Sequence, residues 1–147
     1  MMEFKTSKIP GIIICEPNII KDERGFFTES FRKDLFEEFL GESVAFCQEN
    51  LSNSTFGVIR GLHFQIPPHS QSKLVTVVEG KILDVVVDLR KDSKFYGKNF
   101  KIELDNITCK HLFIPKGFAH GFVVLSKSAR VSYKVDNYYN KRSERGF

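Results

Sequence analysis

The stretch LVTVVEGKILDVVVDL, residues 74–89, decides the fold class of this chain. Two runs rich in Val, Leu and Ile flank Glu79-Gly80-Lys81. β-Branched residues favour extended structure, and a glycine between two such runs is typical of a tight turn. The stretch therefore predicts two strands joined by a compact hairpin.

The second of these strands carries two carboxylates on one face, because alternate residues of a strand point to the same side. Its apolar face consists of Leu83, Val85, Val87 and Leu89, and its mixed face of Ile82, Asp84, Val86 and Asp88. We expect Asp88, near the strand end, to be solvated. Asp84 lies between apolar residues, and we expect it to be an interior acid with a partner.

Strand-like segments continue on both sides of this pair, separated by turn residues. We expect them at 11–15, 26–31, 44–52, 58–65, 98–104, 111–115, 120–126 and 129–139. One helix is expected at 32–41, with Ser30 as its N-cap and Gly41 at its end. Many short strands and one early helix predict an all-β chain with a jelly-roll β-barrel.

Length and composition predict a single globular domain spanning residues 1–147. The 22 basic and 18 acidic residues give a net charge of +4, which suits a phosphorylated small ligand. No Lys/Arg-rich run favours nucleic acid. The three cysteines are scattered without CxxC spacing, as is typical of reduced thiols. With no signal-like or membrane-spanning apolar run, we expect a cytoplasmic protein without a membrane partner.

The four histidines raise the question of a metal site. Metal-binding jelly rolls of the cupin type usually carry a His-x-His pair followed by Glu on one strand, and a further His after a Pro-x-Gly turn. The second part is present as Pro115-Lys116-Gly117 followed by His120, but the first reads His63-Phe64-Gln65. Two imidazoles fall short of the three or more protein ligands that a tight site needs. We therefore expect no metal.

The strand VIRGLHFQ, residues 58–65, contains a conflict of parity. Arg60 and His63 are an odd number of residues apart, so a regular strand would send them to opposite faces. Gly61 between them could host a β-bulge that turns both side chains inward. In the alternative, Arg60 is solvated and His63 lies at the barrel rim. Residue statistics alone favour that alternative.

Five segments resemble signature blocks of bacterial dTDP-4-dehydrorhamnose 3,5-epimerases. They occur in family order and spacing, and they are DERGFFTESF (22–31), RGLHFQ (60–65), IPKGFAHGF (114–122), Tyr133-Lys134 with Tyr138-Tyr139, and Ser143-Glu144-Arg145-Gly146. The chain is therefore similar to cupin-type sugar-nucleotide epimerases over nearly its whole length. This resemblance changes the interpretation of His63 from a structural residue to a catalytic one.

The resemblance implies a homodimeric isomerase without metal or organic cofactor. It would epimerise a dTDP-4-keto-6-deoxy-hexose at C3 and C5, in the dTDP-rhamnose biosynthesis that supplies cell-surface polysaccharide. His63 resembles the base and Tyr133 the acid. The residues that match substrate-binding positions are Arg24, Arg60 and Lys73 around the diphosphate and sugar, Glu29, Gln48 and Asn50 at the nucleotide, His120 and Glu144 near the sugar, and Tyr138 in the fourth block.

These residue types suit the reaction. Hydrogens next to a C4 carbonyl are acidified, and inverting a carbon requires one group that takes the proton and another that returns one to the opposite face. Histidine and tyrosine can fill these roles, and Lys73 is our candidate for stabilising the enolate oxygen. Epimerisation at C3 only, a related ketosugar isomerisation and a catalytically silent sugar-nucleotide-binding barrel remain as alternatives.

Family members continue past the Ser-Glu-Arg-Gly block into a segment whose aspartate pairs with the catalytic histidine. That segment is not among these 147 residues. The resemblance leaves three expectations open: another acid substitutes, the chain works weakly without one, or it is inactive. Asp84 is the candidate substitute, although it could equally serve His120.

Overall fold

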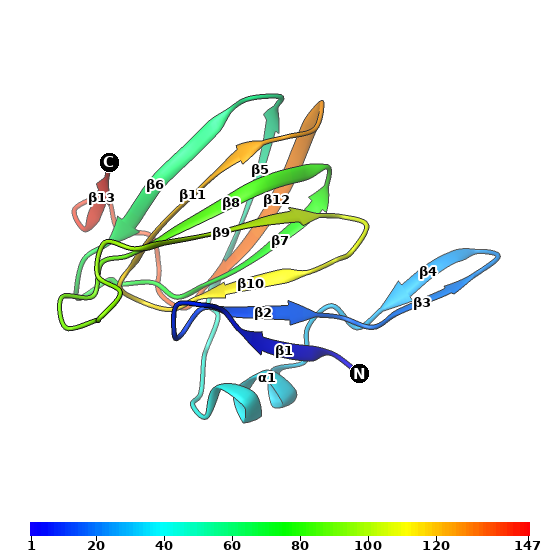
Figure 1. Ribbon diagram of the computed structural model, residues 1–147, viewed down its shortest axis with the longest axis horizontal. Coiled ribbons are helices and arrows are strands. Elements are labelled where there is room, and N and C mark those ends of the chain that lie inside the picture. The colour runs from blue at the N-terminus through cyan, green and yellow to red at the C-terminus, as the bar shows by residue number, and fades with distance from the viewer.

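Two β-sheets packed face to face make up the body of the chain in the computed structural model, which describes residues 1–147 (Figure 1). The six-stranded sheet consists, in spatial order, of β1 (Glu3–Thr6), β2 (Ile13–Glu16), β10 (His111–Ile114), β7 (Lys73–Glu79), β12 (Ser128–Val135) and β5 (Gln48–Thr55). The five-stranded sheet consists of β13 (Glu144–Gly146), β6 (Ile59–Gln65), β11 (Phe118–Val124), β8 (Lys81–Asp88) and β9 (Asn99–Asp105). The predicted all-β jelly roll is confirmed, but the sheets stay separate and do not close into a barrel.

Every strand expected from the sequence is present, and three further strands are β1, β3 (Ile19–Asp22) and β13. These three are short and mostly exposed. Their residues therefore lack the buried alternation on which the sequence prediction relies.

The predicted hairpin between β7 and β8 is wrong. β7 pairs with β10 and β12, whereas β8 pairs with β11 and β9. Gly80 therefore carries the chain from one sheet to the other, with a φ of 88°. Both strands bury apolar residues in one core, among them Val75 and Val86, and stacking two apolar faces buries more of them than pairing the strands side by side would.

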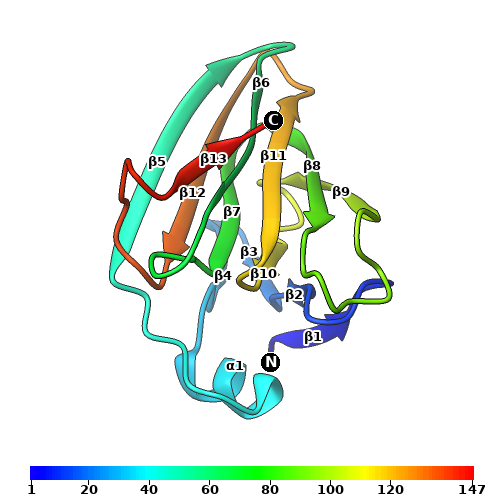
Figure 2. The same ribbon diagram turned by 90° about the vertical axis from the view of Figure 1, so that its left-hand side faces the viewer.

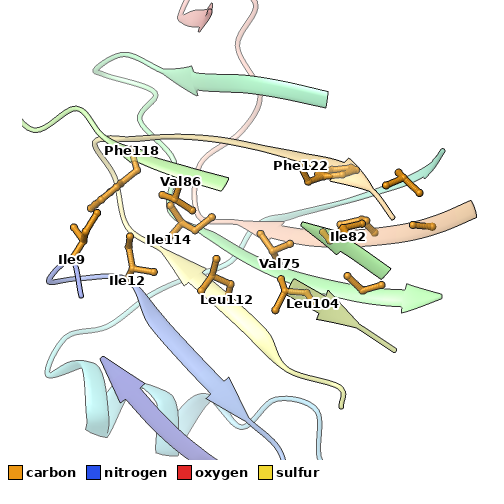
Figure 3. Packing of buried hydrophobic residues seen from close by; sticks show 14 residues of the cluster. Ile9, Ile12, Val75, Ile82, Val86, Leu104, Leu112, Ile114, Phe118 and Phe122 are labelled. Atoms are coloured by element: carbon orange, nitrogen blue, oxygen red, sulfur yellow. The ribbon is translucent and has the colours of Figure 1, made fainter. Parts of the chain in front are cut away.

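The main hydrophobic core fills one part of the space between the sheets. Figure 3 shows Val75, Ile82, Leu104 and Leu112 in this cluster of 14 buried residues. The edge strand β5 instead turns polar side chains inward, namely Gln48, Asn50, Ser52 and Ser54. The sandwich is therefore apolar around β7, β8 and β10 and polar beside β5, and the polar part is where a ligand site can form.

The mixed face of β8 is the buried one. Asp84 and Asp88 are both fully buried. The expectation that Asp88 is solvated is therefore wrong. Two nitrogens of Arg90 donate hydrogen bonds of 3.0 and 2.9 Å to its carboxylate, and Ser93 donates a third, which offsets the cost of burying the charge. The expectation that Asp84 is a partnered interior acid is confirmed.

The helix α1 (Lys33–Leu40) lies beside β1 and β2 at the outer face of the six-stranded sheet (Figure 1). Phe36 is its buried residue, and the ring lies 5.0 Å from that of Phe113 on β10. Gly41 ends the helix with a φ of 78°, as predicted, but Arg32 occupies the N-cap position instead of Ser30. No helix of this chain has the length and apolar character needed to cross a membrane.

A hairpin of β3 and β4 (Gly25–Thr28) projects away from the sandwich (Figure 1). We call residues 19–28 the arm. It exposes three large apolar side chains, with exposed fractions of 57% for Ile20, 59% for Phe26 and 66% for Phe27. The arm thus presents an apolar surface that the chain itself does not cover.

Candidate active site

A bulge between β6 and β11 brings Arg60 and His63 to the same side. His63 is the register partner of His120, and Arg60 is the partner of Phe122, so β6 has one residue more than β11 over this span. Gly61 lies inside the bulge with a φ of 96°. The bulge hypothesis is therefore confirmed, and both side chains line one cavity while staying open to solvent.

Two adjoining cavities lie between the sheets. One, of about 290 Å³, is lined by Gln48, Asn50, His63, Phe64, Gln65, Gln71, Lys73, Tyr133, Tyr139 and Glu144. The other, of about 480 Å³, is lined by Ser52, Ile59, Arg60, Gly61, His63, Lys73, His120, Gly121, Phe122, Tyr133 and Glu144. Both contain His63, Lys73, Tyr133 and Glu144, so we treat them as one space, the inter-sheet cleft.

The two walls of the inter-sheet cleft contribute different residues. His63 comes from β6 in the five-stranded sheet, and Tyr133 comes from β12 in the six-stranded sheet. Figure 2 lets the reader follow β6 and β12 in the two facing sheets. A titratable imidazole and a phenol hydroxyl therefore approach the cleft from opposite sides.

Lys73 lies beside Tyr133 on the six-stranded wall, with its ammonium nitrogen 5.8 Å from the centre of the tyrosine ring. Burial lowers the pKa of Lys73, while the negative charges of Asp84 and Glu144 act in the opposite direction. No carboxylate lies within ion-pair distance of its ammonium group, as the salt bridges of the chain all involve other residues. The cleft thus contains a cation without a direct counter-ion.

A hydrogen-bond network holds the polar end of the inter-sheet cleft. The Tyr139 hydroxyl donates to Glu144 over 2.8 Å, and its backbone N–H donates to Gln48 over 3.1 Å. Gln48 in turn donates to Asn50 over 2.8 Å. The prediction that Gln48 and Asn50 share a face is confirmed.

Tyr138 does not line the inter-sheet cleft, whereas Tyr139 does. The backbone carbonyl oxygen of Tyr138 instead accepts a hydrogen bond of 3.3 Å from the side chain of Gln65. The sequence could not separate these neighbours, because β12 ends at Val135 and the alternation rule of strands no longer applies in the following loop.

Asp84 is hydrogen-bonded to His120 and not to His63. One carboxylate oxygen of Asp84 lies 2.7 Å from Nε2 of His120, and both side chains are buried. The expectation that Asp84 is the carboxylate partner of His63 is therefore wrong, and the alternative that it serves His120 is right. The cause lies in the register, since the two residues are diagonal neighbours on adjacent strands β8 and β11.

Arg24 and Glu29 lie outside the inter-sheet cleft of their own chain. Arg24 is at the tip of the arm, where its 85% exposed side chain pairs with Asp22. Glu29 follows the arm and lies 3.7 Å from Arg32. Apart from Tyr138, the other predicted substrate-binding residues all line the cleft, namely Arg60, Lys73, Gln48, Asn50, His120 and Glu144.

Gln65 is a site residue to which the sequence analysis assigned no role. Its buried side chain accepts a hydrogen bond of 2.8 Å from the backbone of Asn140 and donates one of 2.6 Å to the carbonyl of His69. It thereby anchors the loop that carries Tyr139 and leads to Glu144, the first residue of β13. Nowhere do three His, Cys, Asp or Glu side chains come together in a way that could hold a metal ion.

Comparison with known proteins agrees with this arrangement. The dTDP-4-dehydrorhamnose 3,5-epimerase family matches residues 6–147. The enzyme of that name from Shigella flexneri is 50% identical over 145 residues, which are 99% of this chain and 80% of the relative. The Legionella pneumophila dTDP-6-deoxy-D-glucose-3,5-epimerase, solved in complex with dTDP-4-keto-L-rhamnose, is 44% identical with a TM-score of 0.95, over 100% of this chain and 78% of that one. ChmJ from Streptomyces bikiniensis, a 3'-monoepimerase solved with dTDP-quinovose, is 30% identical with a TM-score of 0.91, over 96% of this chain and 71% of that one. This chain belongs to the dTDP-4-dehydrorhamnose 3,5-epimerase family.

Proposed function

We propose that this chain epimerises a dTDP-4-keto-6-deoxy-hexose at C3 and C5, with His63 as base and Tyr133 as acid. The observation that carries the proposal is the origin of the two groups on opposing walls of one cleft. A sugar ring held between the sheets would present one face to each of them. The family to which the chain belongs and the names of its relatives support the same substrate class.

Each inversion is a transfer of two protons. His63 removes the hydrogen next to the carbonyl, which leaves an enolate on the sugar and an imidazolium on the enzyme. Tyr133 then donates its hydroxyl proton to the other face of the same carbon and becomes a tyrosinate. Proton exchange with water returns both groups to their starting states, so a proton from solvent enters the product.

Lys73 is proposed to stabilise the enolate, because histidine alone is too weak a base. The proton next to a simple ketone lies on the order of a dozen pK units above imidazole, which corresponds to roughly 16 kcal/mol. A cationic donor aimed at the developing oxyanion in a cleft with restricted water is an effective way to close such a gap. Lys73 is the cation that lines both cavities together with His63 and Tyr133.

The remaining cleft residues are proposed to hold the nucleotide diphosphate. Arg60 presents a guanidinium group and is fixed by a 2.8 Å hydrogen bond from its Nε to Ser54, a geometry suited to a phosphate oxygen. At the other end, Gln48 and Asn50 offer amides. The half-exposed ring of Tyr139 offers a flat surface on which a base can stack.

We also propose that the chain works as a homodimer in the cytoplasm. The exposed apolar residues of the arm are of the kind that pack against another subunit. If the arm reaches a second copy, Arg24 and Glu29 serve the partner's cleft, which reconciles their expected role with their distance from their own cleft. Three free cysteines support a reducing compartment.

Solvent isotope incorporation tests the proposed activity. dTDP-4-keto-6-deoxyglucose is incubated with the protein in heavy water and followed by NMR. Deuterium at both C3 and C5 with formation of the inverted product supports the proposal. Deuterium at C3 alone would indicate the C3-only epimerase, as in the name of ChmJ, and binding without any deuterium would indicate a silent sugar-nucleotide-binding protein.

A further inference from the structure

Two charged groups, Lys73 in the wall of the inter-sheet cleft and Asp84 behind His120, have incomplete bonding. Asp84 is fully buried, and its Oδ2 is paired with His120, but its Oδ1 has no hydrogen-bond partner. A buried carboxylate that lacks partners is costly unless positive charge lies nearby. Lys73 supplies such a charge and has no direct counter-ion of its own.

We propose that Asp84 is a positioning residue that acts as the buried counter-charge of the cleft, holding His120 by a hydrogen bond and keeping Lys73 protonated. This inference rests on the proposed role of Lys73 in stabilising the enolate. It assigns to Asp84 a role that involves no contact with the sugar, because Asp84 does not line the cleft.

The hydrogen bond to His120 sets the direction in which that imidazole faces. Because Nε2 is engaged with Asp84, the other nitrogen, Nδ1, is the one available to a ligand, and it makes no hydrogen bond within the protein. His120 lines the larger cavity together with His63 and Lys73. A carboxylate behind an imidazole fixes its tautomer and orientation, as in other sites built on this pair.

The effect on Lys73 is electrostatic. Burial favours the neutral amine and lowers the pKa of Lys73, and the charges of Asp84 first and Glu144 second oppose that change. The titratable and charged groups that line the larger cavity with Lys73 are His63 and Arg60 of β6, Tyr133 of β12, His120 of β11 and Glu144 of β13, and Asp84 of β8 lies behind His120. Among the anions, Asp84 is the buried one, so its field is the less screened by water.

The Asp84→Asn variant tests the proposal because it keeps the size and a hydrogen-bond acceptor for His120 but removes the charge. The matched control is Asp88→Asn, the same change on the same strand and face. Asp88 is equally buried but is compensated by Arg90 and does not line the cleft. The titration of the Lys73 ammonium group is followed by NMR of isotope-labelled lysine, with Lys73→Met used to assign its signal.

We expect Asp84→Asn to lower the proton affinity of Lys73 by about tenfold, because the charge that opposes the effect of burial is removed. Deuterium incorporation should then fall progressively as the pH rises, because a neutral amine cannot stabilise the enolate, and it should approach the wild-type rate at the acid end of the profile. Asp88→Asn should change neither the titration of Lys73 nor the pH dependence of deuterium incorporation. An unchanged Lys73 titration in Asp84→Asn overturns the proposal.

A measurement on the wild type covers the case in which Asp84→Asn does not fold. The chemical shift of the Asp84 carboxyl carbon in labelled protein must change when Lys73 loses its proton. A chemical shift that stays constant through this deprotonation also overturns the proposal. Both NMR titrations need no turnover. A wild type that incorporates no deuterium would therefore refute the proposed function separately, while the titrations still decide the role of Asp84.

Discussion

The histidines of this chain have different partners, and these partners decide what each imidazole can do. His63 is open to the cleft and has no hydrogen bond from a side chain, whereas His120 is tied to Asp84. His69 is bonded to Ser143 over 2.9 Å. His111 lies buried in β10, 2.6 Å from the hydroxyl of Thr76. His63 and His120 therefore both present a free imidazole nitrogen to the cleft, and His63 is the one that matches the position of the base in the family.

His111 should make the stability of the fold depend on pH. Burial, and secondarily the charge of Lys134, lowers the pKa of His111 from 6.5 to about 4. The unfolded chain therefore binds a proton between these values that the folded chain does not, so the free energy of unfolding falls as the pH drops from about 6.5 to 4. The loss is on the order of 3 kcal/mol.

Urea unfolding at pH 7 and pH 4.5 checks this expectation. In His111→Asn, which stays neutral at both values, the difference between the two unfolding free energies should be smaller than in the wild type by most of that amount. His69→Asn serves as the control, since His69 is only partly buried. The same pH dependence in His111→Asn and wild type would show that His111 titrates normally.

Tyr133→Phe should separate the two halves of the reaction. The substitution keeps the ring beside Lys73 and removes only the hydroxyl. Exchange of the sugar proton through His63 can therefore persist while net inversion falls by about 10²- to 10⁴-fold, the usual contribution of a general acid. NMR of the sugar in heavy water measures both quantities at once. Inversion at the wild-type rate would remove Tyr133 from the mechanism.

At the scale of the element, the bulge in β6 assembles the site. The extra residue turns the side chains of Arg60 and His63 to the same side of the strand, and it requires the backbones of Gly61 and Gly121 to approach closely. A Cβ built on Gly61 would lie 2.5 Å from the carbonyl oxygen of His120 and 2.6 Å from the Cα of Gly121. Backbone occupies the space that any side chain at this position would need.

Gly61→Ala should therefore separate β6 from β11 and displace His63. We expect a loss of about 2–4 kcal/mol of stability, from the clash and the positive φ together, and a fall in turnover that exceeds the unfolded fraction. Gly57→Ala is the matched control, because Gly57 also has a positive φ, of 77°, but has nothing within 4 Å of its Cβ position. Denaturant unfolding and turnover are measured for both variants. Equal losses of stability and turnover in the two variants would mean that the positive φ, and not the contact with β11, is the cause.

Within the strands, alternation of side chains predicted part of the site from the sequence, whereas the loops and the connections between strands were beyond its reach. Alternation along strands predicted the shared face of Gln48 and Asn50 and the interior place of Asp84. It could not show that Gly80 connects two sheets, because a glycine turn looks the same whether the following strand pairs or stacks. Nor could it choose between Tyr138 and Tyr139, because their positions depend on Gln65, which is distant in sequence.

At the scale of the whole molecule, one part of the space between the sheets is a hydrophobic core and another part is the cleft. Apolar residues fill the space around β7, β8 and β10, and the cleft occupies the space beside β5 and β12. The arm stands outside both. Arg24 and Glu29 were expected in the site from their sequence block, but a single chain does not bring them there.

Complementation tests whether the arm serves a second copy. Arg24→Ala and His63→Ala should each be poorly active. When the two variants are co-expressed, a mixed dimer would contain one cleft with an intact His63 and an arm with an intact Arg24 from its partner, so activity should return. The control is the isolated mixed dimer of the double variant and wild type, in which neither cleft combines an intact His63 with an intact Arg24 from its partner. Absence of recovery in mixed dimers verified by mass would show that Arg24 acts within its own chain or not at all.

The most direct test of the central claim is the rate of deuterium incorporation into dTDP-4-keto-6-deoxyglucose by wild type and His63→Asn side by side. The mechanism predicts that His63→Asn loses incorporation at both C3 and C5 while its affinity for the nucleotide stays within about a factor of three, since His63 acts on the proton and Arg60 on the diphosphate. Incorporation by His63→Asn at a rate near that of the wild type would contradict the assignment of the base.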